Sequence, residues 1–336
     1  MKIFVTGHRG YIGVHLVDQL KAAGHTVVGC DVDLFEGCAW EPVTDPDVDL
    51  NKDTRNVTEQ DLDGCDAVCH LAAISNDPMG DMDPEITYSI NRDASVRLAE
   101  VAKKAGVGRY LFSGSCSVYG KGDNDEALRE GDKLNPLTAY AKSKIETEER
   151  TAHLADDGFC VSYLRNATAY GHSPMLRIDL VVNNLLASAL SYGEIRIKSD
   201  GSPWRPLVHC ADIARAFVAF CDADASAING QAINIGGNDE NYQVKDVGDQ
   251  VERLIPEAKV VYTGEHGEDS RDYRVNFDKL GRLVPGFKLG YNLVSGMEEL
   301  HKAMVDHGFN AKMFESDQFV RLKTLRNRFD RIGVEA

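Results

Sequence analysis

The sequence predicts an α/β protein built on a doubly wound parallel sheet, with a smaller C-terminal α/β lobe. Short β-branched runs alternate with helical patterns through the first half of its 336 residues, as in the βαβ units of parallel sheets. A glycine-rich turn joins the first strand-like run to the first helix-like segment, where doubly wound folds open their first helix.

Five strands and three helices are expected in the first half. β-branched and aromatic residues mark the strands, and apolar residues at helical spacing mark the helices. The expected strands are Lys2–Thr6, Thr26–Cys30, Ala67–Leu71, Tyr110–Ser113 and Val161–Leu164, and the expected helices are Tyr11–Ala23, Ile90–Ala105 and Thr138–Leu154. Farther along, a helix-like segment at Ala211–Cys221 precedes a strand at Ala232–Ile235, which we expect to return to the main sheet.

These elements divide the chain into two parts. Residues 1–165, together with about 208–237, are predicted to form a Rossmann-type domain, and residues 166–207 and 238–336 a second lobe. The segment Met313–Arg331 carries five arginines and lysines in an acidic chain, and it is a candidate for a basic helix. Such a helix either exposes its charges to solvent or contacts a phosphate or a partner subunit.

Composition and charge argue against several classes of protein. The formal net charge of −16 argues against nucleic-acid binding, which requires a concentrated basic surface. No apolar stretch approaches the roughly 18 residues of a membrane span, and the N-terminus lacks a signal-peptide pattern, so a cytoplasmic location is expected. The eight cysteines are scattered, without metal-ligand spacing, and we expect reduced thiols and no metal site.

The first candidate site is the turn after the first strand, Gly7-His8-Arg9-Gly10-Tyr11-Ile12-Gly13. Its glycines permit a tight turn and let the backbone approach a pyrophosphate, whose charge then meets the N-terminus of the following helix. The position of the turn between a strand and a helix is the one that this mechanism requires. The expected cofactor contacts here are Gly7, Gly10, Tyr11, Ile12 and Gly13.

A carboxylate at the end of the second strand indicates the type of cofactor. Asp31 lies eighteen residues beyond Gly13, where it can accept hydrogen bonds from the adenosine ribose and would repel a 2′-phosphate. NAD is therefore predicted rather than NADP. Asp49 and Leu50, after a strand expected between Asp31 and Ala67, are candidates to flank the adenine.

A candidate catalytic set follows the fourth expected strand. Tyr140 and Lys144 are one helical turn apart on the same helix face. A nearby ammonium stabilises a phenolate, so the tyrosine can serve as a general base. Ser115 ends the upstream strand, at the sheet edge where open α/β folds bind ligands, and it can hydrogen-bond the hydroxyl that Tyr140 deprotonates.

Together these motifs resemble the extended short-chain dehydrogenase/reductases of the NAD-dependent epimerase/dehydratase family. The resemblance covers nearly the whole chain and includes His70-Leu71-Ala72-Ala73, Asn91, Ser115 through Gly120 and Asp200-Gly201-Ser202-Pro203-Trp204-Arg205. It implies that Lys144 also holds the nicotinamide ribose. The remaining expected cofactor contacts are Leu71, Ala72, Ala73, Asn91 and Ser113.

The second half of the chain is similar to the substrate region of UDP-galactose 4-epimerases, which implies a nucleotide-diphosphate sugar as substrate. Asn183 and Asn184 fall in the stretch that grips the substrate diphosphate, and Arg205 falls at a phosphate-binding arginine. Arg271, in a later arginine-bearing loop, is a second phosphate candidate, with Arg274 as the alternative. A guanidinium offers paired donors in one plane, which suits a diphosphate.

The residues after Ser115 favour one reaction of this family. Members that eliminate water carry an Asp-Glu pair there as added acid and base, whereas this chain has Cys116-Ser117. Other members use a cysteine one position later for proton transfer, and Cys116 is expected to point to the other strand face. The resemblance then implies C4 epimerisation through a 4-keto sugar, with hydride moving from C4 to NAD and back. A C4 dehydrogenase or ketoreductase, and a non-catalytic NAD-binding regulator, remain as alternatives.

The segment from Leu164 to Asn183 departs from ordinary galactose epimerases, which have Asn where Thr168 stands. It resembles a subgroup that includes C4-acting enzymes on GDP-linked heptoses. The expected sugar contacts are Ser115, Ser117, Thr168 and Arg177. The family resemblance also implies a homodimer, formed through paired helices such as the one that holds Tyr140.

Overall fold

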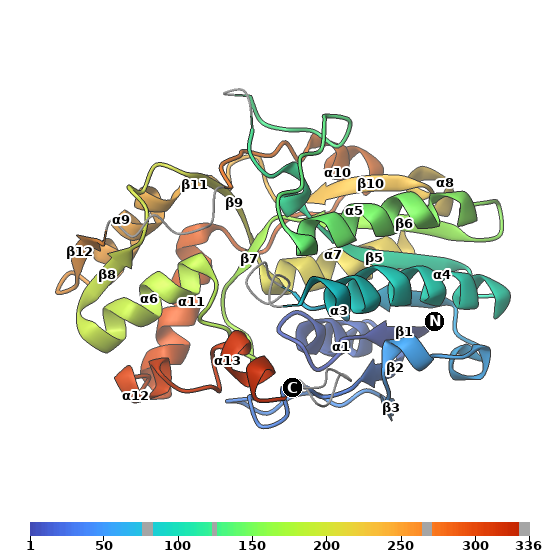
Figure 1. The fold of residues 1–336 in the computed structure, drawn as a ribbon, viewed down its shortest axis with the longest axis horizontal. Helices are drawn as coiled ribbons and strands as arrows, with labels where there is room; N and C mark the ends of the chain where they lie inside the picture. Colours follow the sequence, from blue (N-terminus) through green and yellow to red (C-terminus); the bar gives the residue numbers. More distant parts are fainter. Residues whose placement is uncertain (76–82, 123–125, 264–270, 329–336) are drawn as a thin grey trace.

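The structure is a computed structural model that describes residues 1–75, 83–122, 126–263 and 271–328 (Figure 1). Its largest element is a seven-stranded parallel sheet with the strand order β10-β6-β5-β4-β1-β2-β3. The strands are β1 (Lys2–Thr6), β2 (Thr26–Asp31), β3 (Val48–Asn51), β4 (Ala67–His70), β5 (Arg109–Ser115), β6 (Cys160–Asn166) and β10 (Gln231–Ile235). The predicted doubly wound α/β fold is confirmed.

Helices cover both faces of this sheet. On one face lie α1 (Gly13–Ala22) and α7 (Cys210–Asp222), and on the other α4 (Ala94–Lys104) packs beside α5 (Ala139–Thr151). Alternate residues of β1 supply the two faces, as the period of a strand requires. Ile3 packs on the α7 side, whereas Phe4 packs on the α4 side.

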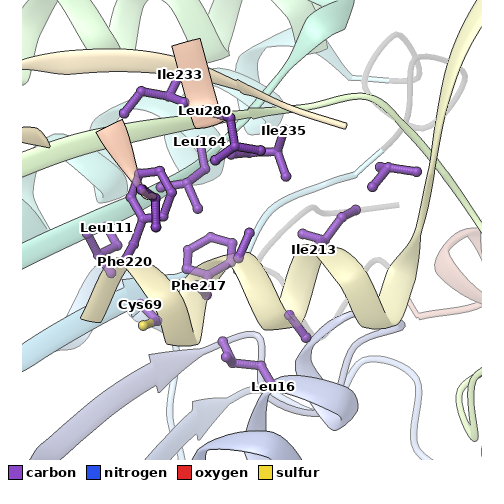
Figure 2. Packing of buried hydrophobic residues seen from close by; sticks show 14 of the residues in the cluster. Leu16, Cys69, Leu111, Leu164, Ile213, Phe217, Phe220, Ile233, Ile235 and Leu280 are labelled. Carbon is purple, nitrogen blue, oxygen red and sulfur yellow. The ribbon is translucent and has the colours of Figure 1, made fainter. Parts of the chain in front are cut away.

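Helix α7 fastens the late strand β10 to the early part of the sheet. Figure 2 shows Phe217 and Phe220 of α7 packed among Leu111 of β5, Leu164 of β6 and Ile233 of β10. All five side chains are fully buried. The expectation that a strand at Ala232–Ile235 returns to the main sheet is confirmed, because β10 pairs in parallel with β6.

The second half of the chain forms two small sheets with their own core. These sheets contain β7 (Thr168–Tyr170), β9 (Trp204–His209) and β11 (Asn241–Gln243), and the pair β8 (Glu194–Ile197) and β12 (Lys259–Tyr262). The helices α6 (Val181–Tyr192), α9 (Val244–Leu254) and α11 (Leu293–Asp306) supply much of the core around them. We propose for the folded chain the division expected above, at 1–165 with 208–237 and 166–207 with 238–336.

Short helical segments complete the described chain. They are α3 (Pro84–Tyr88), α8 (Ala225–Ile228), α10 (Asp278–Leu283), α12 (Ala311–Phe314), α13 (Arg321–Arg326), the 3₁₀ turns η1 (Thr54–Asn56), η2 (Glu59–Leu62), η4 (Cys116–Tyr119) and η5 (Ala152–Leu154), and a π turn, η3 (Ser89–Asp93). Within the described ranges, no helix combines the length and the apolar character needed to cross a membrane.

Two expectations of local structure are wrong. Asp49 and Leu50 lie within β3 and not after it. The basic segment Met313–Arg331 is not one helix over its described part, which contains the end of α12 and the separate helix α13. The reason is burial of Phe319, which is 0% exposed in the core of the second half. Helix α12 ends at Phe314, and Val320, the residue before α13, is extended at φ −112°, so the two helices are separate.

Candidate functional site

A cavity of about 1440 Å³ opens at the carboxyl ends of the parallel strands, which is where open α/β sheets bind ligands. The glycine turn and the ends of β2, β4 and β5 form one side of it. Elements of the second half, from β7 to β9, form the other side. The cavity therefore lies between the parts of the chain that the sequence assigns to cofactor and to substrate.

The glycine turn fits a dinucleotide. Gly7 has φ +70°, and a Cβ added there would lie 2.7 Å from the amide nitrogen of Ala72. A Cβ on Gly13 would lie 2.1 Å from the carbonyl oxygen of Gly7. Helix α1 begins beside the cavity, and no side chain among the described residues caps it. The positive end of its dipole is thus available to a phosphate.

A buried hydrogen-bond network holds the loop after β4 against this turn. Thr6 Oγ1 accepts hydrogen bonds from the amides of Leu71 at 3.2 Å and Ala72 at 3.1 Å. Leu71, Ala72 and Ala73 line the cavity. Asn91 does not line it; its side chain bonds both the amide and the carbonyl of Ile74, at 2.8 and 2.9 Å. The geometry thus makes Asn91 a support of the cofactor loop.

Asp31 lines the cavity at the end of β2. Its carboxylate accepts hydrogen bonds from the amides of Arg9 at 3.2 Å and Asp33 at 2.9 Å, and burial raises its pKa. Each carboxylate oxygen retains a second lone pair for a ribose hydroxyl. Asp49 and Leu50, the expected adenine neighbours, are outside the cavity lining, because Asp49 turns to an ion pair with Arg9 and Leu50 packs in the sheet core.

The residues that line this end of the cavity in their place are Asp53 and Thr54. They follow β3 and begin η1, where the Asp53 side chain accepts the amide of Arg55. The sequence indicated that a helical turn begins here, because Asp is a preferred residue at an N-cap. Several aspartates in this stretch obscured which one ends the strand.

Tyr140 and Lys144 share the cavity-facing side of α5, as the spacing predicts. Thr138 caps the helix by accepting the amide of Ala141 at 3.2 Å, which fixes where the first turn begins. The Lys144 ammonium lies 5.6 Å from the centre of the Tyr140 ring and donates a hydrogen bond to the carbonyl of Ser113 at 2.8 Å. Burial lowers the pKa of Lys144 to about 7, although Glu148 opposes this shift.

Ser113, Ser115 and Ser117 all line the cavity at the end of β5. Ser115 Oγ accepts the amide of Ser117 at 3.1 Å, and its own proton is left for another acceptor. Ser117 Oγ is buried and has no hydrogen-bond partner among the described residues. Asn166 also lines the cavity and was not predicted from the sequence. Its Oδ1 is likewise buried and has no hydrogen-bond partner within the described chain. Such groups are rare in native proteins unless a ligand or water satisfies them.

Cys116 points away from this wall, on the side opposite to Ser115. It is 1% exposed within the hydrophobic core, and its thiol donates to the carbonyl of Arg165 at 3.1 Å. Burial raises its pKa far above the ordinary thiol value. The expectation that this side chain faces away from the site is confirmed, and the thiol is unsuited to proton transfer at substrate carbon.

The candidate sugar side of the cavity comes from β7, the following loop and α6. Thr168, Arg177 and Asn184 line it. Arg177 is 6% exposed, forms an ion pair with Asp179 at 2.8 Å, and donates to Ser75 Oγ at 2.8 Å. Although burial lowers the pKa of Arg177, the Asp179 carboxylate outweighs this effect and raises it.

Asn183 lies behind this wall and not on it. Its amide group donates to the carbonyl of Arg177 at 2.8 Å and to the Tyr11 hydroxyl at 3.1 Å, and its carbonyl accepts the amide of Gly171 at 2.9 Å. This fully buried side chain connects the glycine turn to the substrate loop. Asn184, one position on, reaches the cavity while bonding the carbonyl of Ile178.

The two predicted phosphate-binding arginines lie side by side. Arg205 and Arg271 both line the cavity, and the Arg205 guanidinium donates a hydrogen bond to the Arg271 carbonyl. Arg274, the alternative, stacks on the Trp204 ring at 5.1 Å and is not part of the lining. The structure therefore brings together Arg205 and Arg271, from segments 66 positions apart in sequence.

Several cavity-lining residues were not predicted from the sequence. They are Ser75, Thr138, Asn166, Arg196, Lys198, Phe314, Val320, Arg321, Leu322 and Arg326. The last five belong to the C-terminal segment, for which a phosphate contact was one of the alternative interpretations. The excess of positive charge in this segment is the sequence feature that indicated such a contact.

Comparison with known proteins identifies the family. Residues 3–236, more than half of the chain, match the NAD dependent epimerase/dehydratase family. A UDP-glucose 4-epimerase of Mycolicibacterium smegmatis is 32% identical over 248 residues, covering 70% of this chain and 77% of that protein.

Solved structures share the fold. A NAD-dependent NDP-hexosamine 5,6-dehydratase superposes with a TM-score of 0.81 at 24% identity, covering 91% of this chain and 98% of that one. A UDP-glucuronic acid 4-epimerase of Bacillus cereus, in complex with UDP-glucuronic acid and NAD, gives 0.77 at 24% identity over 91% and 99%. The chain therefore belongs to the NAD-dependent epimerase/dehydratase family, and its cofactor is NAD.

Proposed function

We propose that this enzyme epimerises a nucleotide-diphosphate sugar at C4 through a transient 4-keto intermediate. The observation that carries the proposal is the grouping of Tyr140, Lys144 and Ser115 on one cavity wall. Bound NAD would supply the hydride acceptor for oxidation of the sugar and the hydride donor for the return step. The glycine turn, Asp31 and the loop Leu71–Ala73 would hold the cofactor, and the chain's own side chains handle protons and orientation.

Tyr140 is the proposed general base and acid at the C4 hydroxyl. The Lys144 ammonium, 5.6 Å from the ring, favours the phenolate by charge attraction. Because Lys144 is 2% exposed, little water weakens this attraction. Ser115 is proposed to orient the same hydroxyl, since its oxygen already accepts the Ser117 amide and its proton is free to be donated to the substrate.

The wall after Ser115 favours epimerisation over dehydration. Elimination of water requires an added acid and base beside the sugar. Position 116 places its thiol in the core, and position 117 offers only a hydroxyl. Ser117 and Asn166, with buried groups that lack partners among the described residues, are proposed to bind sugar hydroxyls. These contacts orient the ring without adding a second acid.

The diphosphate of the substrate is proposed to bind Arg205 and Arg271. Both residues line the cavity, and two guanidinium groups match the two phosphates of such a ligand. Thr168, Arg177 and Asn184 would contact the sugar side. The segment from Leu164 to Asn183 forms this part of the wall, and it resembles enzymes that act on GDP-linked heptoses. A GDP-linked heptose should therefore be tested beside hexoses.

The test is incubation of the purified protein with UDP-, GDP-, ADP- and dTDP-linked sugars, including a GDP-heptose, with products identified by NMR. We expect one C4 epimer, with deuterium placed at C4 of the substrate retained at C4 of the product. Tyr140→Phe should lower kcat by at least about 100-fold, while Tyr192→Phe, outside the cavity lining, should leave kcat unchanged.

Other products would replace the proposal by an alternative. Release of a 4-keto sugar with stoichiometric NADH would show a C4 dehydrogenase. An elimination product would refute the C4 epimerase mechanism. Tight NAD binding without turnover of any sugar in the panel would favour a non-catalytic regulator.

We also propose a homodimer through the helix that holds Tyr140. Light scattering should give twice the chain mass of 36.9 kDa. Glu149→Arg, at an exposed position of α5, should shift the mass to one chain if this helix forms the interface. An unchanged dimer mass in this variant would place the interface elsewhere.

A further inference from the structure

The C-terminal strap, defined here as residues 315–328, crosses from the second half of the chain to the Rossmann sheet. It follows α12 and contains α13, which lies between the helices of the second half and the region of α1 and β2 (Figure 1). Val320, Arg321, Leu322 and Arg326 of the strap line the cavity. The strap therefore forms part of the wall between the two halves.

One end of the strap is anchored in the second half. The Phe319 side chain is fully buried there. Its carbonyl accepts the amide of Ile178 at 3.0 Å, and the Arg321 guanidinium donates to the carbonyl of Met175 at 2.9 Å. These bonds align the strap with the loop that carries Arg177.

The other end is anchored on the cofactor side. Leu325 is 1% exposed and packs against Ile74, in the loop after β4. The Arg328 guanidinium donates to the carbonyls of Leu34 at 2.6 Å and Glu36 at 2.9 Å, in the loop after β2. The strap thus spans the two loops that flank the glycine turn.

The strap leaves an excess of positive charge on this wall. Arg321 is 2% exposed, and its hydrogen bonds run to carbonyl oxygens while its guanidinium stacks 4.6 Å above the Phe35 ring. Burial lowers the pKa of Arg321 and the positive charge of Arg177 lowers it further, although the Cys38 side chain and the Asp179 carboxylate oppose this shift. The Asp179 carboxylate is already paired with Arg177.

Arg326 adds a third guanidinium to this wall. It is exposed on α13 and lines the cavity, without a hydrogen bond or an ion pair to any other part of the described chain. Arg177 and Arg321 are buried, and buried cations are destabilising unless a counter-charge compensates them. The described lining of the cavity carries eight lysines and arginines but four aspartates, in a chain of net charge −16, which indicates that a bound anion supplies the missing negative charge.

We propose that the strap is a ligand-binding element in which Arg321 and Arg326, with Arg177, add to the contacts that bind a diphosphate in the cavity. Two ligands carry a diphosphate, namely the NAD cofactor and a nucleotide-diphosphate sugar. Only binding of the nucleotide-diphosphate sugar rests on the proposed function. Anchoring on the loops after β2 and β4 sets the strap beside the cofactor half. The guanidinium groups supply paired donors and charge, which both diphosphates accept.

The test compares Arg326→Ala with Lys323→Ala. Both remove one positive charge from exposed positions of α13, but Lys323 is outside the cavity lining. Dissociation constants are measured by calorimetry for NAD, for UDP and for GDP at low and high salt. We expect Arg326→Ala to weaken one class of ligand by about 5- to 10-fold at low salt, and Lys323→Ala by less than about 2-fold.

Each outcome decides the proposal. A loss confined to NAD assigns the site to the cofactor diphosphate, and a loss confined to UDP or GDP assigns it to the substrate. Unchanged constants for all three ligands in Arg326→Ala, or an equal loss in Lys323→Ala, would overturn the proposal.

A second variant tests the buried member. Arg321→Lys keeps the charge but removes the planar donor pair, and we expect about 5-fold weaker binding of the same ligand with a circular dichroism spectrum like that of the wild type. Because these readouts need no turnover, absence of an epimer product would refute the proposed function and leave this inference standing. Full-strength binding in Arg321→Lys would exclude Arg321 from the site.

Discussion

Ser115 and Cys116 are neighbours in the chain with opposite surroundings, one in the cavity wall and one in the core. We predict that Ser115→Ala lowers kcat by about 10- to 100-fold, because it removes a donor to the reacting hydroxyl. Cys116→Ala should keep kcat within about 2-fold and lower the free energy of unfolding by about 1 kcal/mol. Steady-state kinetics and urea unfolding measure the two effects, and a larger kcat loss in Cys116→Ala would contradict the assignment.

The buried position of Lys144 favours its proposed catalytic role but lowers the free energy of unfolding. Burial lowers its pKa to about 7 from the ordinary lysine value of 10.5, so the folded state disfavours the charged form. We predict that Lys144→Met abolishes turnover but raises the free energy of unfolding by about 1–2 kcal/mol near pH 7. The gain should shrink as pH rises from 7 toward 10.5, where the unfolded chain also loses this proton.

Chemical unfolding at pH 7 and pH 9.5 measures this difference. Lys142→Met, on the exposed side of the same helix, is the control and should change stability by less than about 0.5 kcal/mol. A Lys144→Met protein that is less stable than wild type at pH 7 would show that its bond to the Ser113 carbonyl outweighs the burial of charge.

At the scale of elements, the junction of β1 and α1 has no room for a side chain. A Cβ on Gly13 would lie 2.1 Å from the Gly7 carbonyl oxygen, whereas an added Cβ on Gly281 of α10 would meet no packing neighbour within 4 Å among the described residues. We predict that Gly13→Ala destabilises the protein by about 3 kcal/mol and prevents NAD binding. Gly281→Ala should stabilise it by about 0.5 kcal/mol. Thermal unfolding with and without NAD would detect both changes, and wild-type NAD affinity in Gly13→Ala would refute the close packing.

The elements that the sequence predicted well are those whose pattern is local. β1 begins and ends where expected, because a run of apolar residues meets a glycine turn. The strands β7 and β11 have three residues each, too short for any periodicity, and they exist through pairing with β9. The tail was predicted as one helix because its basic composition is local information, whereas the burial of Phe319 that divides it depends on a distant core.

The candidate site shows the same contrast. The spacing of Tyr140 and Lys144 and of the turn glycines is set within one helix or loop, so their shared face was predictable. Asp49 and Leu50 were expected beside the adenine and Asp53 was not, because strand ends are uncertain among closely spaced aspartates. Arg321 and Arg326 reach the cavity only through long-range packing of the strap, which no local pattern contains.

At the scale of the whole molecule, acid sensitivity should reflect His70. Burial lowers its pKa to about 3, and its ring bonds Thr6 and Ser95 in the core. In the unfolded chain this histidine binds a proton near pH 6.5, whereas in the folded chain it stays neutral. Its contribution to the free energy of unfolding is therefore complete above pH 6.5 and is lost as pH falls toward 3. Between pH 5 and pH 6.5 the free energy of unfolding should depend less on pH in His70→Gln than in the wild type, with a slope that is smaller by up to about 1.4 kcal/mol per pH unit.

Urea unfolding at half-unit steps from pH 7 to pH 5 measures the slope. His153→Gln, at an exposed position, is the control and should keep the wild-type slope. An identical pH dependence in His70→Gln and wild type would assign the acid sensitivity to other groups.

The placement of β10 beside β6 has a consequence for biosynthesis. Every residue of β6 is buried in the finished sheet, yet its outer partner is made from residues 231–235. At about 5–20 residues per second, a ribosome needs roughly 3 to 14 s to make the intervening chain. During that interval the nascent protein presents an unpaired apolar edge, which is a template for pairing with other nascent chains. The step most exposed to aggregation is thus the wait for β10 and α7, and chaperones that bind nascent chains are expected to act there.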